Sequence, residues 1–340
     1  MISIHMLPVG NGDCFILVLQ DGDHTQLLVI DSGFVGTYRI FKPNLFNLLD
    51  KYSCDVHMLL THIDTDHIGG YKTLFQDDKF KDYGRIAAFY YNTTKSLKKL
   101  APDLTPAMLG DEDRINSGTK TGLPDAIRLE HLLRDKGVPV VTGLHLGSSI
   151  TFCPGMQAIV LSPSPATLSK YQAWVKAQTD LPTAAGISDY KKDLKELMAN
   201  PFDPSTTLTN ASSISFLIEA DGRRLLFLGD SCPADIEEAL RIQGYSEAYP
   251  LKADVVKVSH HGSRHNTSTE MLRLICGKYF LISGSGGRGH PDKEALARIV
   301  QTQDAPVFCF NYDIAADIFT PSEVEKFHIQ AEFRRELIFE

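Results

Sequence analysis

Short apolar runs separated by polar turns dominate the first 60 residues of the chain. Three of them, Ile2–Pro8, Cys14–Gln20 and Gln26–Asp31, are divided by Gly-Asn-Gly-Asp and Asp-Gly-Asp sequences. Apolar runs of this length, bounded by Gly and Asp, are typical of β-strands joined by turns. Tyr38–Lys51 then carries apolar residues at helical spacing, and Val56–Leu60 predicts a further buried strand.

The second half of the chain repeats this succession of predicted strands and helices. A strand at Arg85–Tyr91, a helix at Pro124–Lys136 and strands within 151–163 are predicted between the two halves. The later predicted strands are Ser212–Glu219, Arg224–Gly229, Asp254–Ser259, Tyr279–Ser283 and Val307–Asn311, and the later predicted helices are Pro233–Gln243, Pro291–Gln301 and Ser322–Ile329. Polar motifs fall at the ends of strands in both halves, where layered α/β proteins build their sites.

Two segments depart from this pattern. Residues 92–122 are polar and irregular, and residues 165–205 are largely helical in pattern but carry no chemical motif. We interpret both segments as insertions that cap the active site.

Composition narrows the class of protein. The chain has 340 residues, 43% hydrophobic and 22% charged, which is ordinary for a soluble globular protein. No apolar run approaches the roughly 20 residues that cross a bilayer, and the N-terminus does not resemble a signal peptide. The six cysteines lie singly without a CxxC pair, as expected for reduced thiols in a cytoplasmic protein. The net charge of −8 argues against nucleic-acid binding over a broad basic surface, but it is compatible with a local basic channel.

Four potential metal ligands lie directly after the strand predicted at Val56–Leu60. They are His62, Asp64, Asp66 and His67. Two imidazoles and two carboxylates this close supply the neutral nitrogen and anionic oxygen ligands that suit a divalent transition metal. The alternative is a solvated acidic turn that happens to contain histidines, and the recurrence of candidate ligands later in the chain argues against it.

Two later motifs also follow apolar strands. Asp230 occupies a place where a carboxylate is unfavourable unless it is paired or bound to metal, and the alternative role is the cap of a helix beginning near Pro233. His260 and His261 follow the next predicted strand. Adjacent side chains of an extended strand point to opposite sides, so we expect one histidine to bind metal and the other to orient it or contact substrate. We favour His260 as the ligand.

These motifs together resemble the metallo-β-lactamase superfamily, and within it the ComEC-type hydrolase domain associated with DNA uptake. The shared pattern is His-x-Asp-x-Asp-His-x-Gly-Gly, then Gly-Asp, then Ser-His-His-Gly-Ser. Further elements keep the family's order: Pro8–Asp13 is similar to its Val-Gly-Gln-Gly-Asp turn, Ile30–Gly33 to its Ile-Asp-Thr-Gly, Asn210–Ser213 to its Asn-x-x-Ser and Gly289–Pro291 to its Gly-His-Pro.

The resemblance implies an α/β fold in which residues 1–340 form one domain, a four-layer αβ/βα sandwich with two metals at one edge of the paired sheets. The implied ligands of the first metal are His62 and Asp64, and those of the second are Asp66, His67 and His260, with Asp230 bridging the two. Asp31 is expected to hold a ligand histidine by its other ring nitrogen.

Two features set the chain apart from the wider superfamily. Asp64 stands where the commoner motif has histidine, as it does in the ComEC-type branch. A histidine that many members supply before the Gly-Asp element has no clear equivalent, because His145 reads as a satisfied loop residue. Asn210 fills part of that position, which makes the first site oxygen-rich and favours manganese over zinc.

The remaining polar residues are assigned to the chemistry around the metals. His290, before Pro291 at a predicted helix start, is expected to face the metals as an electrophile or proton donor. We expect Asp66 and His261 to take part in catalysis with it, and Ser263 to line the same mouth.

The sequence thus predicts a metal-dependent hydrolase holding one or two zinc or manganese ions. A phosphodiesterase, specifically a nuclease acting on nucleic acid or nucleotides, is the leading hypothesis, because two metals suit in-line attack on an anionic diester. Hydrolysis of a small ester, thioester, lactam or lactone in a capped pocket is the alternative, since one fold hosts many activities. A metal-stabilised binding module without catalysis is a third interpretation.

Overall fold

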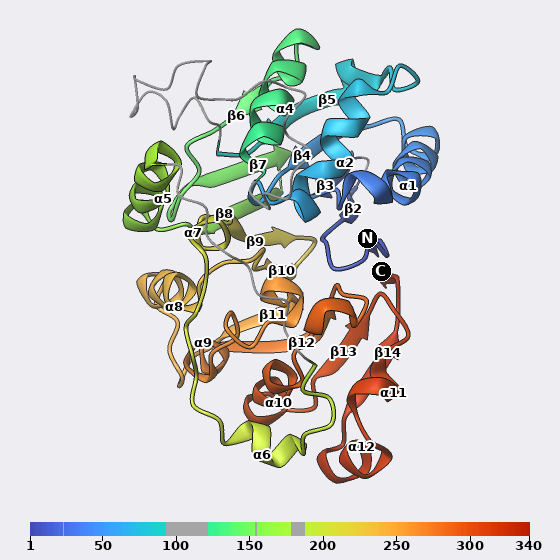
Figure 1. The fold of residues 1–340 in the computed structure, drawn as a ribbon. Coiled ribbons are helices and arrows are strands. Elements are labelled where there is room, and N and C mark those ends of the chain that lie inside the picture. The colour runs from blue at the N-terminus through green and yellow to red at the C-terminus, as the bar shows by residue number, and fades with distance from the viewer. Residues whose placement is uncertain (23, 93–121, 154, 178–187) are drawn as a thin grey trace.

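The computed structural model describes residues 1–22, 24–92, 122–153, 155–177 and 188–340 (Figure 1). The predicted insertion at 92–122 falls almost wholly outside the described residues. The described parts of the second predicted insertion, 165–205, contain the helices α5 (Pro165–Ala177) and α6 (Leu194–Met198).

One sheet contains seven strands in the order β15-β1-β2-β3-β4-β5-β6. Their bounds are β1 Ile2–Met6, β2 Phe15–Asp21, β3 His24–Ile30, β4 Asp55–Leu59, β5 Ile86–Tyr90, β6 Val140–Val141 and β15 Glu336–Phe339. Strands β15, β1, β2 and β3 pair antiparallel, whereas β3, β4, β5 and β6 pair parallel. The antiparallel part leads into the parallel part at β3.

The other sheet contains eight strands in the order β14-β13-β12-β11-β10-β9-β8-β7. Their bounds are β7 Ser149–Cys153, β8 Met156–Ser162, β9 Ser215–Ala220, β10 Arg223–Phe227, β11 Leu251–Lys257, β12 Ile275–Ile282, β13 Val307–Phe310 and β14 Gln330–Phe333. Strands β7 to β10 pair antiparallel and β10 to β14 pair parallel, so each sheet joins an antiparallel half to a parallel half.

Helices lie along the outer faces of both sheets (Figure 1). On the first sheet they include α1 (Tyr38–Lys51), α2 (Thr65–Gln76) and α4 (Leu123–Asp135). On the second they include α6, α8 (Pro233–Ile242), α9 (Thr269–Arg273) and α10 (Lys293–Thr302). The other helices of the described ranges are α7 (Leu208–Ala211), α11 (Ala315–Ile318) and α12 (Pro321–Phe327), together with the 3-10 turns η1 (Val35–Thr37), η2 (Asp82–Arg85), η5 (Ser259–Gly262) and η6 (Gly287–Gly289).

Three apolar clusters hold these layers together. The first joins the facing sides of the two sheets, where Phe15 of one sheet meets Phe227 of the other with ring centroids 5.6 Å apart. The second packs α1, α2 and α4 on the first sheet, and the third packs α8, α9 and α10 on the second. The layer order is helix, sheet, sheet, helix, which confirms the predicted α/β class and the αβ/βα arrangement.

The strands that the sequence predicted are present, with shifted ends. The predicted helix at Tyr38–Lys51 has the bounds of α1, whereas β11 begins at Leu251, before the predicted start at Asp254. Strands β6, β14 and β15 were not predicted. They are short strands at the edges of the sheets, and apolar side chains stay exposed in all of them, including Val140, Phe333 and Ile338.

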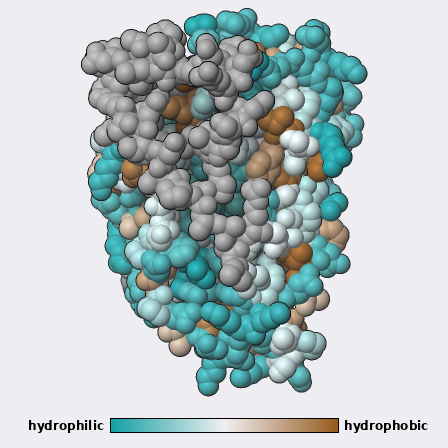
Figure 2. Space-filling view, viewed as in Figure 1, coloured by the Kyte–Doolittle hydropathy of each residue, from teal (hydrophilic) through white to brown (hydrophobic). Residues whose placement is uncertain are grey.

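Hydrophilic residues predominate on the face shown in Figure 2, and apolar residues form small separate patches there. Within the described ranges, no helix combines the length and apolar character needed to cross a membrane.

Candidate metal centre

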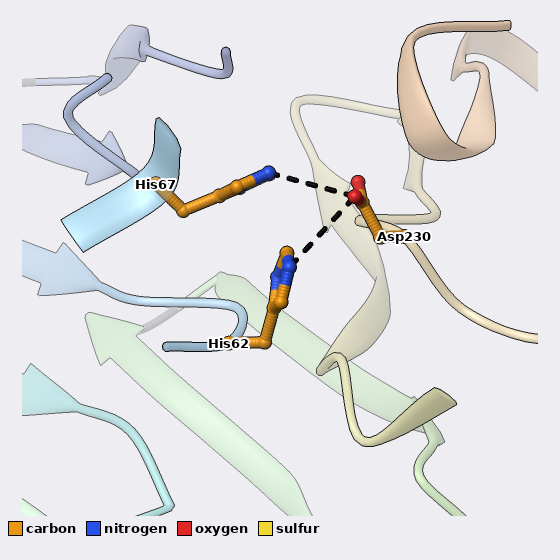
Figure 3. A group of neighbouring side chains, drawn as sticks. All are labelled: His62, His67 and Asp230. Atoms are coloured by element: carbon orange, nitrogen blue, oxygen red, sulfur yellow. Dashed lines mark ion pairs between the residues drawn. The ribbon is translucent and has the colours of Figure 1, made fainter. Parts of the chain in front are cut away.

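His62, His67 and Asp230 converge from the two sheets (Figure 3). His62 follows β4, His67 lies in the first turn of α2, and Asp230 follows β10 of the other sheet. The Nε2 atoms of His62 and His67 lie 3.7 and 3.6 Å from Oδ2 of Asp230. The carboxyl ends of parallel strands in both sheets therefore meet at one edge of the sandwich.

His260 approaches the same carboxylate oxygen. Its Nε2 lies 3.7 Å from Oδ2 of Asp230, and its Nδ1 lies 2.9 Å from Oδ1 of Asn266. Asn266 also donates through Nδ2 to the carbonyl oxygen of Asp230 at 3.0 Å. Asn266 therefore ties the histidine and the carboxylate to each other.

Asp31 orients His67 from the far side of the ring. Its Oδ2 lies 2.7 Å from His67 Nδ1, and both side chains are fully buried. Thr61 donates to the same carboxylate from its backbone N–H and from its hydroxyl, at 2.8 and 2.7 Å. These donors hold Asp31 in the position where it accepts from Nδ1, which leaves His67 Nε2 directed at Asp230.

His62 is held in the same way by hydroxyl groups. Its Nδ1 lies 3.1 Å from Thr61 Oγ1 and 3.4 Å from Ser213 Oγ. Ser213 Oγ also accepts a hydrogen bond from the backbone N–H of Asp230 at 3.0 Å. One serine thus fixes both His62 and the start of the Asp230 loop.

Several ring and carboxylate atoms at the centre are buried without a hydrogen-bond partner among the described residues. They are Nε2 of His62, His67 and His261, and Oδ1 of Asp230. Buried polar atoms are normally paired, because desolvation without a partner costs free energy. Ligand atoms that share a tetrahedral zinc lie about 3.3–3.5 Å apart, since each bond is about 2.0–2.2 Å long. The separations of 3.6–3.7 Å around Asp230 come close to that value, so this donor set fits a divalent cation.

A second group of candidate ligands adjoins the first. Asp66, His67 and His261 bring one donor atom each within 4.8 Å of one another, and His261 Nε2 lies 3.6 Å from Asp66 Oδ2. The resemblance assigned His260 to this set, whereas the structure places His261 beside Asp66. An extended strand was expected here, but His260 and His261 lie in the turn η5 with left-handed φ angles of 47° and 56°. Both rings consequently face the centre.

Asp64 stands at the outer rim beside His62. Its Oδ2 lies 3.7 Å from His62 Nε2, and 24% of its side chain is exposed. Burial of the carboxyl raises the pKa of Asp64, an effect that the nearby His62 opposes. It is therefore the least paired carboxylate of the cluster.

The carboxylates of the cluster raise the pKa values of two of its histidines, His67 and His261. Burial lowers the pKa of His67, but Asp230, Asp31 and Asp66 together raise it well above its usual range. Burial also opposes protonation of His261, yet Asp13 and Asp66 raise its pKa to about 9. In the metal-free protein these carboxylates are thus neutralised by protons on the histidines.

His260 and the carboxylates show the converse effects. Burial lowers the pKa of His260 to about 4 despite the neighbouring Asp230. Burial works against ionisation of Asp66, but His67 and His261 lower its pKa to about 2. Asp66 is therefore ionised, and His260 neutral, near neutral pH, as metal ligands need to be.

The other predicted site residues lie near the centre in different roles. The His290 ring lies 5.1 Å from that of His260, and its Nδ1 lies 3.3 Å from Asp292 Oδ2. The Asn210 amide nitrogen lies 3.3 Å from the His260 ring. Ser263 is buried and accepts a hydrogen bond from the N–H of His265 at 3.2 Å. In the described part of the chain, no hydrogen bond joins the Ser263 side chain to a candidate ligand.

Sequence reasoning did not assign Asp13, Lys257, Asn266 or Ser283 to the site. Asp13 lies in the Gly-Asn-Gly-Asp turn, whose sequence predicts a turn but no contact with a histidine. Its side chain is 2% exposed and lies 3.2 Å from His261 Nδ1. An acidic residue that ends a glycine turn directly before an apolar strand was the available signal.

Sequence comparison gives one local match. No family model matches the chain. ComE operon protein 3 of Bacillus subtilis (strain 168) is 30% identical over 112 residues, which are 32% of this chain and 14% of that protein. The likeness therefore covers a small part of that relative's length.

Solved structures give distant matches. Zn²⁺-bound PqqB from Methylobacterium extorquens aligns over 100% of both chains with a TM-score of 0.43 and 13% identity. The metallo-β-lactamase fold protein YhfI from Bacillus subtilis aligns over 100% of both chains with a TM-score of 0.38 and 10% identity. The hydrolase AbOPH of the β-lactamase superfamily aligns over 68% of this chain and 67% of its own, with a TM-score of 0.33 and 14% identity. Likenesses this distant assign neither a function nor ligands to this chain.

Proposed function

We propose that the chain is a metal-dependent hydrolase whose centre is formed by His62, His67 and Asp230 together with Asp64, Asp66, His260 and His261. The observation that carries the proposal is the set of buried Nε2 atoms that meet around Asp230 without a hydrogen-bond partner in the described structure. Each of these rings is fixed through its other nitrogen, as is usual for histidine ligands of a metal. Zinc and manganese both suit this mixture of imidazole and carboxylate donors.

The two groups of ligands support a dinuclear arrangement. His62 and Asp64 belong to one side, Asp66 and His261 to the other, and Asp230 faces both His62 and His67. His67 also belongs to the group that contains Asp66 and His261. One or two metal ions per chain are therefore expected.

The protein side chains supply binding and orientation to this chemistry. A bound divalent cation makes a nucleophilic hydroxide available near neutral pH and stabilises anionic oxygens of the substrate. Asp64 and Asp66, which are partly exposed at the rim, are placed to accept a proton from attacking water. His290, whose Nδ1 lies 3.3 Å from Asp292 Oδ2, is the group that we assign to donate a proton to the leaving group.

A phosphodiester is the substrate class that we favour, and a nuclease the specific activity. Asp64, in place of the histidine of the commoner motif, makes one side of the centre rich in oxygen ligands and favourable to manganese. The local identity to ComE operon protein 3 supports the same branch. An anionic diester suits this centre, because divalent cations held by these residues would stabilise the negative charge of its oxygens.

The test combines metal content with cleavage. Purified protein would be assayed by elemental analysis and then offered single-stranded DNA, double-stranded DNA, RNA and bis(p-nitrophenyl) phosphate with manganese or zinc. We expect cleavage of at least one diester by wild type and a loss of about 10²-fold or more in Asp66→Ala. Metal-loaded wild type that cleaves none of them would remove the phosphodiesterase assignment.

The second candidate is hydrolysis of a small ester, thioester, lactam or lactone. It is favoured by the position of α5 of the predicted insertion, because its Tyr171 lies beside His62 together with Tyr91, so that an inserted helix covers one side of the centre. Hydrolysis of p-nitrophenyl acetate or a homoserine lactone, with no cleavage of any diester, would support this candidate.

A further inference from the structure

A lysine is fully buried behind the candidate metal centre. Lys257 ends β11, its side chain is 1% exposed, and it donates a hydrogen bond through Nζ to the carbonyl oxygen of Gly229 at 3.0 Å. The same Nζ forms an ion pair with Oδ2 of Asp13 and lies 3.9 Å from Oδ1 of Asp230. Burial of a lysine ammonium group costs free energy unless a carboxylate pairs with it, and Asp13 provides that carboxylate.

Asp13 links this lysine to one candidate ligand. Its Oδ1 lies 3.2 Å from His261 Nδ1 and accepts a hydrogen bond from the Ser283 hydroxyl. Its two oxygens therefore meet three donors: the lysine on one, the imidazole and the hydroxyl on the other. These contacts fix both oxygens of the Asp13 carboxyl group.

The backbone of the same turn contacts the ligand across from His261. The N–H of Asp13 donates to the carbonyl oxygen of Asp66 at 3.3 Å. A Cβ on the preceding Gly12 would lie 2.5 Å from that carbonyl oxygen, so glycine is needed for this approach. The turn thus fixes both Asp66 and His261.

We propose that Lys257 is a positioning residue for the half of the metal centre that contains Asp66 and His261: its ion pair holds the Asp13 side chain in place, so that Asp13 directs Nε2 of His261 toward Asp66. The inference rests on the proposed metal site. His62 and His67 do not depend on this device, because neutral hydroxyls hold His62 and Thr61 supports the Asp31 that holds His67. Lys257 Nζ also lies 3.9 Å from Asp230 Oδ1, which is beyond hydrogen-bond distance, whereas it forms a direct ion pair with Asp13. Loss of Lys257 should therefore weaken the group that contains Asp66 and His261 more than the group that contains His62.

The test measures metal binding rather than catalysis. Wild type, Lys257→Met, Asp13→Asn and the double variant would be titrated with Zn²⁺ by calorimetry, and metal retained after gel filtration would be counted. In Lys257→Met we expect one equivalent bound as in wild type and the affinity of the other reduced about 10–100-fold, as for other groups that orient ligands. Asp13→Asn, which is nearly isosteric, should show the same loss.

A second buried lysine provides a matched control. Lys293 in α10 is also 1% exposed and forms an ion pair with Glu323 at 2.8 Å, away from the centre. Lys293→Met and Lys257→Met should both lower the unfolding midpoint, but in Lys293→Met both metal equivalents should keep their wild-type affinity. The double variant Lys257→Met/Asp13→Asn should lose no more metal affinity than either single variant, because both act through one contact.

The results distinguish the role of Lys257 from the existence of the metal site. Unchanged metal binding in Lys257→Met, or additive losses in the double variant, would overturn the role of Lys257 while leaving the metal site in place. A wild-type chain that binds no Zn²⁺ or Mn²⁺ would overturn the proposed metal site, and the role of Lys257 with it.

Discussion

Each candidate histidine ligand is fixed by a hydrogen bond or ion pair to its outward nitrogen. The partners are Thr61 and Ser213 for His62, Asp31 for His67, Asn266 for His260, and Asp13 for His261. Such partners select the tautomer, orient the ring and raise its basicity toward a metal. At the scale of residues, the partners should therefore matter nearly as much as the ligands.

Asp31→Asn tests this for His67. The amide would present its NH₂ either to His67 Nδ1–H or to the Thr61 donors, so one pair of donors would face each other without an acceptor. We expect Zn²⁺ affinity to fall about 10–100-fold. Calorimetric titration gives the affinity, and Asp50→Asn on the exposed side of α1 serves as the control. Equal affinities in all three proteins would contradict the role of Asp31.

The pH dependence of the metal-free protein tests the charge of His261. Its pKa in the folded protein is raised from 6.5 to about 9, so protonated His261 stabilises the fold fully below pH 6.5. That contribution is lost as the pH rises through about 9. Urea unfolding of chelator-treated wild type should therefore weaken between pH 7 and pH 10 more steeply than that of His261→Gln. Parallel pH profiles would show that His261 is neutral in the fold.

The sequence was informative about which residue types meet but less so about their pairing. It placed Asp31 beside a ligand histidine, and Asp31 lies 2.7 Å from His67. It did not separate His260 from His261, because left-handed backbone angles at both positions cannot be read from an alternating strand pattern. It missed Asp13, whose contact with His261 joins turns that are distant in sequence. The assignments of all these residues as ligands or partners remain predictions for metal titration.

At the scale of elements, helix α2 is placed by close backbone contacts. Ser32 donates to the carbonyl oxygen of His67 from its N–H and its hydroxyl, both at 2.8 Å, and the N–H of Gly70 donates to Gly33 O at 3.2 Å. The periodicity of α1 or of the apolar strands is visible in the sequence, since one face is buried. Contacts of this backbone-to-backbone kind leave no such pattern beyond the glycines themselves.

Gly70→Ala tests this contact. A Cβ at this position would lie 2.2 Å from the carbonyl oxygen of Ser32, so α2 would have to shift away from the loop that carries Asp31. We expect a loss of about 1–3 kcal/mol in the free energy of unfolding, as for other overpacked sites, with weaker Zn²⁺ binding. Gly84→Ala, where a Cβ meets nothing within 4 Å, is the control. Equal urea midpoints for the two variants would show that α2 tolerates the shift.

At the scale of the whole molecule, the centre joins two halves that are far apart in sequence. His62 and His67 come from the first sheet and its helix α2, whereas Asp230, His260 and His261 come from the second sheet. The two sheets also meet through their shared apolar cluster. The α/β class follows from the alternation of strands and helices, but the edge strands β14 and β15, which extend the two sheets from one C-terminal segment, carry too weak a pattern to be predicted.

A metal that bridges the halves should stabilise the whole fold, because the ligands come together only when both sheets are in place. Binding to the folded state alone contributes about 4 kcal/mol when free metal is 1,000 times its Kd. For a chain of this size that corresponds to a rise of roughly 5–8 °C in the unfolding midpoint. Calorimetric scans of wild type after chelation, and again after Zn²⁺ is restored, measure it, with Asp230→Asn as the variant that should respond less. An identical unfolding midpoint with and without Zn²⁺ would mean that the imidazoles around Asp230 bind no metal in the folded protein.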